Sequence, residues 1–220
     1  VWAYNPGASK AEFLDRKEGE RITKLYLHDD YLWICPASSE VELYNLEKGT
    51  LHTIEMEERC RRFLSDTFIT DIVYADDRRY FLATWNGLVS LAFGLEKLEK
   101  ATCSFDFPEQ SFPLKMEKKI TDLLWNEERQ ILWVGTFGNG VRQMHCMEKT
   151  YCSLGQKFDT DIIGIEEDQQ GCIWVLTKGG ELWKSESKQL SVKTTFKPWT
   201  KGLKSGETYQ MYKDKHGHIW

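Results

Sequence analysis

The sequence lacks a long hydrophobic run and an excess of positive charge. No apolar stretch among its 220 residues approaches the roughly 20 that a membrane-spanning helix needs, and the first residues show no basic, apolar and small-residue order of a signal peptide. Lysine and arginine total 29 against 34 aspartates and glutamates, a formal net charge of -5. This balance disfavours nucleic acid as a direct partner. An initiating methionine is also missing, so we expect a segment of a longer protein.

Cysteine is present but without a recognisable spacing. The six cysteines include no Cys-x-x-Cys pair and match neither a zinc ribbon nor a dense disulfide scaffold. We expect most of them to be free and buried as small apolar side chains, with a bridge left open only between Cys146 and Cys152, which flank an expected hairpin. No metal site and no cofactor are predicted, and cysteine usage leaves the compartment open. The six are Cys35, Cys60, Cys103, Cys146, Cys152 and Cys172.

A sustained helical period is missing as well, and short strands take its place. Residues 120–141 contain one complete example of a unit that recurs in weaker form along the chain. Its apolar runs 120–125 and 131–134 are typical of strands, and the polar residues 126–129 between them are typical of a turn. A Gly-Asn-Gly hairpin at 138–140 then leads into a third strand.

An aromatic residue recurs at one position of this unit. Its spacing of 41 to 52 residues is typical of β-propeller blades or of helical pairs, and the strand content favours blades. We therefore predict an all-β fold, a β-propeller of four-stranded antiparallel blades with about four whole blades and a half blade at each end. The recurring aromatics are Trp33, Phe81, Trp133, Trp174 and Trp220. Residues 1–220 form a single predicted segment, with half blades at 1–14 and 208–220 and whole blades at 22–57, 69–107, 120–154 and 162–196.

The aromatic column is predicted to be mainly structural. Burying one such ring removes roughly 150 to 250 Å² from water, a large contribution to a core. In a propeller the inner strands are covered on both faces by neighbouring blades, so apolar runs need not alternate with polar residues. Trp33, Trp133 and Trp174 are therefore expected in the core.

Two acidic turns carry a further pattern. Asp168 and Asp214 each begin an Asp-x-x-Gly-x-x-Trp sequence, which resembles the Asp-box turn of sialidase-like propellers. In that turn the carboxylate accepts hydrogen bonds from backbone N–H groups of its own hairpin. We expect both aspartates to be structural, and His216 and His218 to belong to a solvated turn because no third metal ligand accompanies them.

The repeating unit resembles the two-component regulator propeller repeat of bacterial hybrid sensor kinases. That repeat has an opening isoleucine, an acidic turn, an Ile/Leu-Trp-Val-Gly-Thr strand and a glycine hairpin, and residues 120–140 match it closely. Residues 162–180 and 209–220 match it nearly as well, whereas Cys35 and Ala83 stand where the first two blades would have glycine. As a repeated pattern, the resemblance covers nearly the whole chain.

The resemblance implies both an architecture and a role. It implies a fragment of a larger ring, commonly of seven blades, in the extracytoplasmic sensor region of a hybrid two-component histidine kinase. Such a region would be periplasmic, as the outer part of an inner-membrane protein, would sense an oligosaccharide and would belong to a homodimer. The kinase would lie outside this segment, which would itself not be an enzyme. Two alternatives remain: a scaffold for protein interaction or dimerisation, and a propeller glycosidase or lyase, which needs two carboxylates about 5 to 10 Å apart.

The candidate ligand site lies on the rim that carries the hairpins between second and third strands, where repeats present variable loops. Linkers between blades, among them 115–119 and 158–159, should reach the same rim. Aromatic faces beside amide, guanidinium or carboxylate groups are typical of sugar sites. A competing interpretation is that the asparagines are present only because their hairpins need positive φ angles. The candidates are Trp85, Asn86, Phe137, Asn139, Arg142 and Lys178.

Two arrangements of the chain ends are compatible with the pattern. The first and last pairs of strands could combine into one blade and close a ring of five, which would place Trp2 and Trp220 in the same sheet. We predict instead an open arc of a larger ring.

Overall fold

Antiparallel sheets dominate the structure, a computed structural model. Within the part of the chain that it describes, four sheets have four strands each and one has two. One helix accompanies them among the described residues. The described residues are 2–5, 10–13, 21–37, 40–76, 78–95, 98, 100–104, 119–146, 150–153, 158, 160–188, 194–199 and 210–220.

The four-stranded sheets each use consecutive strands, paired in chain order. Blade 1 comprises β3 (Ile22–His28), β4 (Tyr31–Pro36), β5 (Glu42–Asn45) and β6 (Thr50–Thr53). Blade 2 comprises β7 (Ile69–Asp76), β8 (Arg79–Thr84), β9 (Gly87–Ala92) and β10 (Thr102–Ser104). Blade 3 comprises β11 (Ile120–Asn126), β12 (Ile131–Thr136), β13 (Val141–His145) and β14 (Thr150–Ser153). Blade 4 comprises β15 (Ile162–Glu167), β16 (Ile173–Thr177), β17 (Leu182–Ser185) and β18 (Phe196–Pro198).

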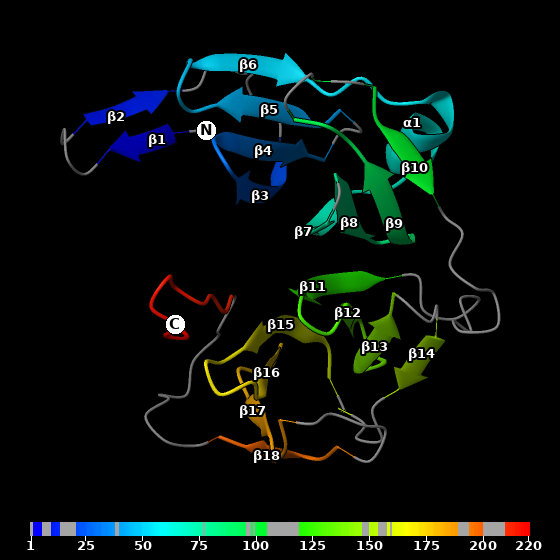
Figure 1. Ribbon diagram of the computed structural model, residues 1–220, viewed down its shortest axis with the longest axis vertical. Coiled ribbons are helices and arrows are strands. Elements are labelled where there is room, and N and C mark those ends of the chain that lie inside the picture. Colours follow the sequence, from blue (N-terminus) through cyan, green and yellow to red (C-terminus); the bar gives the residue numbers. More distant parts are fainter. Residues whose placement is uncertain are drawn as a thin grey trace.

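The blades follow one another along an arc. Figure 1 shows their first strands, β3, β7, β11 and β15, on the inner side of that arc, and the first strand of each blade contacts that of the next. Because every strand pairs antiparallel with its chain neighbour, each blade is a meander that can repeat radially. The prediction of an all-β propeller fragment is confirmed. The ranges predicted for a single segment with a half blade at each end stay a prediction.

The hydrophobic core lies between the blades and not within them. One buried cluster joins blades 1 and 2, a second joins blades 2 and 3, and a third joins blades 3 and 4. Trp33, Phe81 and Trp133 are at most 2% exposed in these layers, as the aromatic column predicts. Trp174 is only half-buried, because its indole N–H turns to Asp168. The prediction of core packing is thus correct for Trp33 and Trp133 and only partly so for Trp174.

Each inner strand contains a register shift after its first residue. Such a bulge turns the following side chain out of the regular alternation. In blade 2 that side chain is Asp71, which accepts a hydrogen bond from the N–H of Leu123 at 2.7 Å. In blade 3 it is Asp122, which accepts one from the N–H of Ile165 at 2.6 Å. The bulges of β7 and β11 therefore connect each of these strands to the inner strand of the next blade.

A short helix and a disulfide occupy the connection from blade 1 to blade 2. Helix α1 (Glu58–Ser65) buries Cys60 and Leu64, and Cys60 forms a disulfide with Cys103 of β10. The expectation that most cysteines are free is wrong for this pair. No spacing rule reveals it, because 43 residues separate the two and only the return of β10 beside the helix brings their Cα atoms to 5.6 Å. The side chain of Cys152 lies outside the described residues, so a bridge to Cys146 stays untested.

The two described ends of the chain do not share a sheet. Strand β1 (Trp2–Asn5) pairs with β2 (Lys10–Phe13) in the two-stranded sheet. Trp220 exchanges backbone hydrogen bonds with Tyr212 instead. Trp2 and Trp220 therefore do not share a sheet, as the open arc requires. Of the helices in the described part of the chain, none is long and apolar enough to span a membrane.

Candidate functional site

A buried threonine ends the second strand of blades 2, 3 and 4. Thr84, Thr136 and Thr177 are fully buried, and their hydroxyls donate to the carbonyls of Gly87, Gly140 and Glu181 across the hairpin. These bonds hold the hairpins in one conformation. The residue after each threonine, namely Trp85, Phe137 or Lys178, is thereby placed at the rim in the same relative position.

The linkers that precede blades 3 and 4 are hydrogen-bonded to the residue that follows the second strand of the same blade. The N–H of Phe137 donates to the carbonyl of Lys119 at 3.0 Å, and the N–H of Lys178 donates to that of Asp161 at 2.9 Å. Lys119 and Asp161 directly precede the inner strands β11 and β15. A residue before the first strand of a blade therefore lies beside the residue that follows its second strand.

These two sets of positions form a continuous group, which we call the rim cluster. The ring centroids of Trp85 and Phe137 are 6.2 Å apart, and Phe68 packs 4.8 Å from Trp85. The Lys119 ammonium lies 4.4 Å from the Trp85 centroid and 5.1 Å from that of Phe137. The Lys178 ammonium lies 5.4 Å from the Phe137 centroid and 3.6 Å from the Asp161 carboxylate. The cluster comprises Phe68, Trp85, Lys119, Phe137, Asp161 and Lys178.

The rim cluster combines exposed ring faces with charges of both signs. Trp85 is 36% and Phe137 40% exposed, so part of each ring is open to solvent. The ammonium groups attract the ring faces by about 0.5 to 1 kcal/mol each at such exposed positions, which orders the side chains without burying them. An apolar surface flanked by donors and an acceptor can bind the ring and hydroxyl groups of a polyhydroxylated molecule.

The structure brings three of the six predicted site residues together: Trp85, Phe137 and Lys178. Asn139 is exposed in the hairpin after Phe137, and Arg142 is half-buried in β13 opposite Val134. Lys119 lies in a linker that was expected at this rim. Phe68 and Asp161 were not predicted, although both occupy the position immediately before the opening isoleucine, a signal that the repeat itself provides.

The hairpin asparagines do not supply the positive φ angles that the competing interpretation assigns to them. Positive φ angles are adopted by Gly87, at 126°, and by Gly140, at 72°, whereas Asn86 and Asn139 have no positive φ. The Asn86 side chain instead donates to the carbonyl of Asp66 at 3.3 Å. The glycines alone satisfy the turn requirement.

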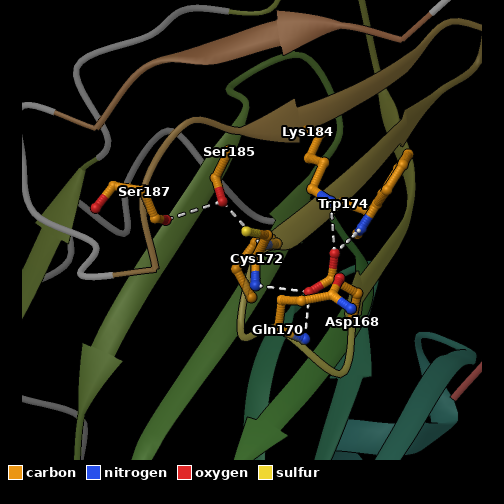
Figure 2. A network of polar contacts seen from close by, with 8 residues as sticks. Asp168, Gln170, Cys172, Trp174, Lys184, Ser185 and Ser187 are labelled. Carbon is orange, nitrogen blue, oxygen red and sulfur yellow. Dashed lines mark hydrogen bonds and ion pairs between the residues drawn. The ribbon is translucent and has the colours of Figure 1, made fainter.

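The opposite rim carries the acidic turns. Figure 2 shows Asp168 accepting hydrogen bonds from the backbone N–H groups of Gln170 and Cys172 and from the Trp174 indole, each at 2.9 Å. Its second oxygen also lies 2.8 Å from the Lys184 ammonium. Burial by itself would raise the pKa of Asp168, but the hydrogen bonds from Lys184 and Trp174 outweigh it and lower that pKa. The carboxylate is therefore held ionised as a structural cap.

Asp214 repeats this arrangement. It accepts the backbone N–H groups of His216 and His218 and the Trp220 indole, and the hydrogen bond from Trp220 is the main reason that its pKa falls to about 2. The predicted structural role of Asp168 and Asp214 is confirmed. His218 lies with Nδ1 at 3.1 Å from the Asp214 carboxylate. Within the described ranges no three His, Cys, Asp or Glu residues are grouped as metal ligands.

A charged group lies on the inner strands. The Lys24 ammonium is 2.5 Å from the Asp71 carboxylate, and Asp122 follows at the equivalent bulge of the next blade. Burial, and after it the negative charge of Asp71, raise the pKa of Asp122 well above its usual range. This group connects blades 1 to 4 near the centre of the arc.

The arrangement of the sheets identifies the class of fold to which this chain belongs. Four-stranded antiparallel meanders, joined by interblade cores and arranged along an arc, make this chain a β-propeller segment.

Several solved structures have a fold similar to that of this chain. The chain is similar to two crystal structures of the extracellular domain of BT4673 from B. thetaiotaomicron, described in one as a one-component and in the other as a hybrid two-component system. Both are 19% identical over 99% of this chain, with TM-scores of 0.72 and 0.70. The extracellular domain of BT3049 from the same organism, described as part of a hybrid two-component system, is 12% identical over 96% of the chain, with a TM-score of 0.58.

This chain spans only a part of each of these structures. It covers 28% of the first two and 34% of the third. No protein-family model matches the sequence, and no curated protein matches it. The structural neighbours thus share the fold of this chain at low sequence identity.

Proposed function

We propose that this propeller segment belongs to the extracytoplasmic sensor region of a hybrid two-component signalling protein and that its rim cluster binds an oligosaccharide. The observation that carries the proposal is the rim cluster itself, two part-exposed aromatic rings flanked by two ammonium groups and a carboxylate. The segment would bind and not catalyse. A histidine kinase elsewhere in the same homodimeric protein would receive the signal.

Two observations support the location. The structural neighbours are extracellular domains of two-component systems. The disulfide between Cys60 and Cys103 is of a kind that persists in oxidising compartments and is rare in the cytosol. A periplasmic position, as the outer part of an inner-membrane protein, fits both.

The proposed binding depends on stacking. A pyranose ring presents an apolar face of C–H groups, and the surface formed by Trp85 and Phe137 offers a matching apolar area. Lys119, Lys178 and Asp161 lie close enough to donate to or accept from the hydroxyls around that face. Rigid rings lose little conformational entropy on binding, so their contacts contribute efficiently.

Calorimetric titration with cellobiose, xylobiose, mannobiose and digalacturonate tests the proposal. We expect at least one of these sugars to bind, and Trp85→Ala or Phe137→Ala to weaken its binding by about 1 to 2 kcal/mol, roughly five- to thirty-fold. Trp199→Ala is the matched control, because Trp199 is 39% exposed but packs against Trp174 of blade 4. The Trp199→Ala variant should bind the sugar with the same affinity as the unmodified protein.

Two results would contradict the proposal. If none of the four sugars produces a heat of binding, the result would favour the scaffold for protein interaction or dimerisation. Cleavage of a sugar during the titration, detected by chromatography, would favour the glycosidase or lyase. We expect the sugars to be recovered intact, since Asp168 and Asp214 serve as turn caps.

A further inference from the structure

The rim cluster carries more positive than negative charge. Its two ammonium groups, of Lys119 and Lys178, are accompanied by a single carboxylate, that of Asp161. The chain as a whole has the opposite balance, with a formal net charge of -5. The positive excess at the proposed ligand site is therefore a local feature of this rim and does not follow from the composition.

The two lysines of the cluster differ in their partners. The Lys178 ammonium lies 3.6 Å from a carboxylate oxygen of Asp161, and the Asp161 side chain is only 14% exposed. The backbone holds the same two residues together, because the N–H of Lys178 donates to the carbonyl of Asp161 at 2.9 Å. The charge of Lys178 is thus already balanced within the protein.

Lys119 contacts aromatic rings instead of a carboxylate. Its ammonium lies 4.4 Å from the Trp85 centroid and 5.1 Å from the Phe137 centroid, and it forms no ion pair with any carboxylate in the part of the chain that the structure describes. Lys119 is exposed, and its carbonyl accepts the N–H of Phe137, so its backbone is fixed beside the two rings. The positive excess of the cluster therefore resides at Lys119, next to the exposed aromatic surface.

The position of this ammonium group favours one kind of sugar. A pyranose that stacks on Trp85 and Phe137 brings its ring substituents close to Lys119, since the ammonium contacts both rings. A hydroxyl group at that place offers the ammonium a neutral acceptor. The C6 carboxylate of a uronic acid offers two ionised oxygens and adds the attraction between opposite charges. Cation–π attraction to an exposed ring is weak, so the flexible lysine can turn from the rings to such a carboxylate.

We propose that the rim cluster recognises an acidic oligosaccharide, one that contains a uronic acid, and that Lys119 pairs with the uronic acid carboxylate. This rests on the proposed function, from which it takes the stacking of the sugar ring on Trp85 and Phe137. Because Asp161 already balances Lys178, one carboxylate at Lys119 neutralises the cluster. A neutral sugar leaves the charge of Lys119 unmatched.

Calorimetric titration with matched pairs of sugars at pH 7 tests this preference. One pair is α-1,4-linked digalacturonate and α-1,4-linked galactobiose, and the other is glucuronosyl-β-1,4-glucose and cellobiose. The members of a pair differ only in whether C6 is a carboxylate or a hydroxymethyl group. At low salt we expect the acidic member of at least one pair to bind about ten-fold or more tightly than its neutral counterpart. The difference should shrink in about 0.5 M salt, which screens ion pairs.

Variants of Lys119 show whether its charge causes the preference. Lys119→Met removes the ammonium and keeps an unbranched side chain, so this variant should bind the two members of a pair with affinities within about three-fold of each other. Lys119→Arg keeps the charge and should retain the preference. Lys48→Met is the matched control, because Lys48 is another exposed lysine, in the hairpin between β5 and β6 of blade 1. The Lys48→Met variant changes the net charge equally and should keep the full preference.

The outcomes separate the role of Lys119 from oligosaccharide binding itself. If a neutral sugar binds as tightly as its acidic counterpart, the rim cluster binds oligosaccharides but does not select acidic ones. A preference that persists in Lys119→Met, or that is lost equally in Lys48→Met, would also overturn the role of Lys119 and leave oligosaccharide binding intact. If no sugar, acidic or neutral, produces a heat of binding, both the preference and the proposed function are wrong.

Discussion

At the scale of single residues, the two capping aspartates show how one side chain organises a turn. Asp168 satisfies two backbone N–H groups and also fixes the Trp174 indole. Unpaired N–H groups would otherwise remain at the turn, each with a desolvation cost where solvent is excluded. The Asp-x-x-Gly-x-x-Trp spacing is sufficient to predict this role, because the two backbone N–H groups and the indole all lie within six residues of Asp168.

Replacing Asp168 by alanine should therefore destabilise the protein. We expect a loss of about 1 to 3 kcal/mol in the free energy of unfolding, measured by urea denaturation at pH 7. Glu127→Ala, in the equivalent turn of blade 3, should change stability by less than about 0.5 kcal/mol, because Glu127 is an exposed side chain there. Equal stability of the two variants would show that the Asp168 hydrogen bonds have no net effect.

Asp122 differs from Asp168 because its pKa is raised and not lowered. Its pKa is raised in the folded state, so the folded protein holds a proton that the unfolded chain releases at lower pH. Stability is consequently lost as the pH rises from the usual carboxyl range toward the raised value. Asp122→Asn can still accept the hydrogen bond from Ile165 and carries no ionisable group.

We therefore expect Asp122→Asn to be more stable than the unmodified protein at pH 7 and to lose this advantage below about pH 4. Denaturant unfolding at a series of pH values measures the difference. Asp30→Asn, on the exposed turn of blade 1, serves as the control and should show no such trend. A difference for Asp122→Asn that is constant with pH would contradict the assigned ionisation.

At the scale of elements, the sequence predicts the hairpins but not the helix that connects blades 1 and 2. The threonine at the end of β8, β12 and β16 occurs at a fixed place in the repeat, so its hairpin contacts are local and recur. Helix α1 is only eight residues long and its stability comes from burying Cys60 and Leu64 against its surroundings. Because these burial contacts are tertiary, the local sequence pattern does not predict the helix.

The disulfide between α1 and β10 should contribute strongly to stability. It closes a segment of 43 residues, for which the chain-entropy estimate is about 4 kcal/mol. The double variant Cys60→Ala and Cys103→Ala should lose a large share of this, measured by urea denaturation. Adding a reductant should destabilise the unmodified protein to a similar extent and leave the double variant unchanged. No effect of reductant on the unmodified protein would contradict the prediction.

At the scale of the whole molecule, the packing of one blade against the next decides the candidate site. The rim cluster takes residues from blades 2, 3 and 4. No single repeat contains it. The position that Trp85, Phe137 and Lys178 share in the repeating unit predicts all three, whereas only the packing of linkers beside hairpins places Phe68 and Asp161 next to them.

The sequence by itself determined the strands, the turns and the blade period. These depend on residues that are neighbours along the chain: alternating turns and apolar runs, glycines at positive φ, and aspartates that cap their own hairpins. Tertiary structure alone decided the Cys60–Cys103 bridge and the Asp71 and Asp122 contacts between inner strands. The reason is that these contacts join residues roughly one blade apart, and their distances depend on how neighbouring sheets pack face to face and not on any local pattern.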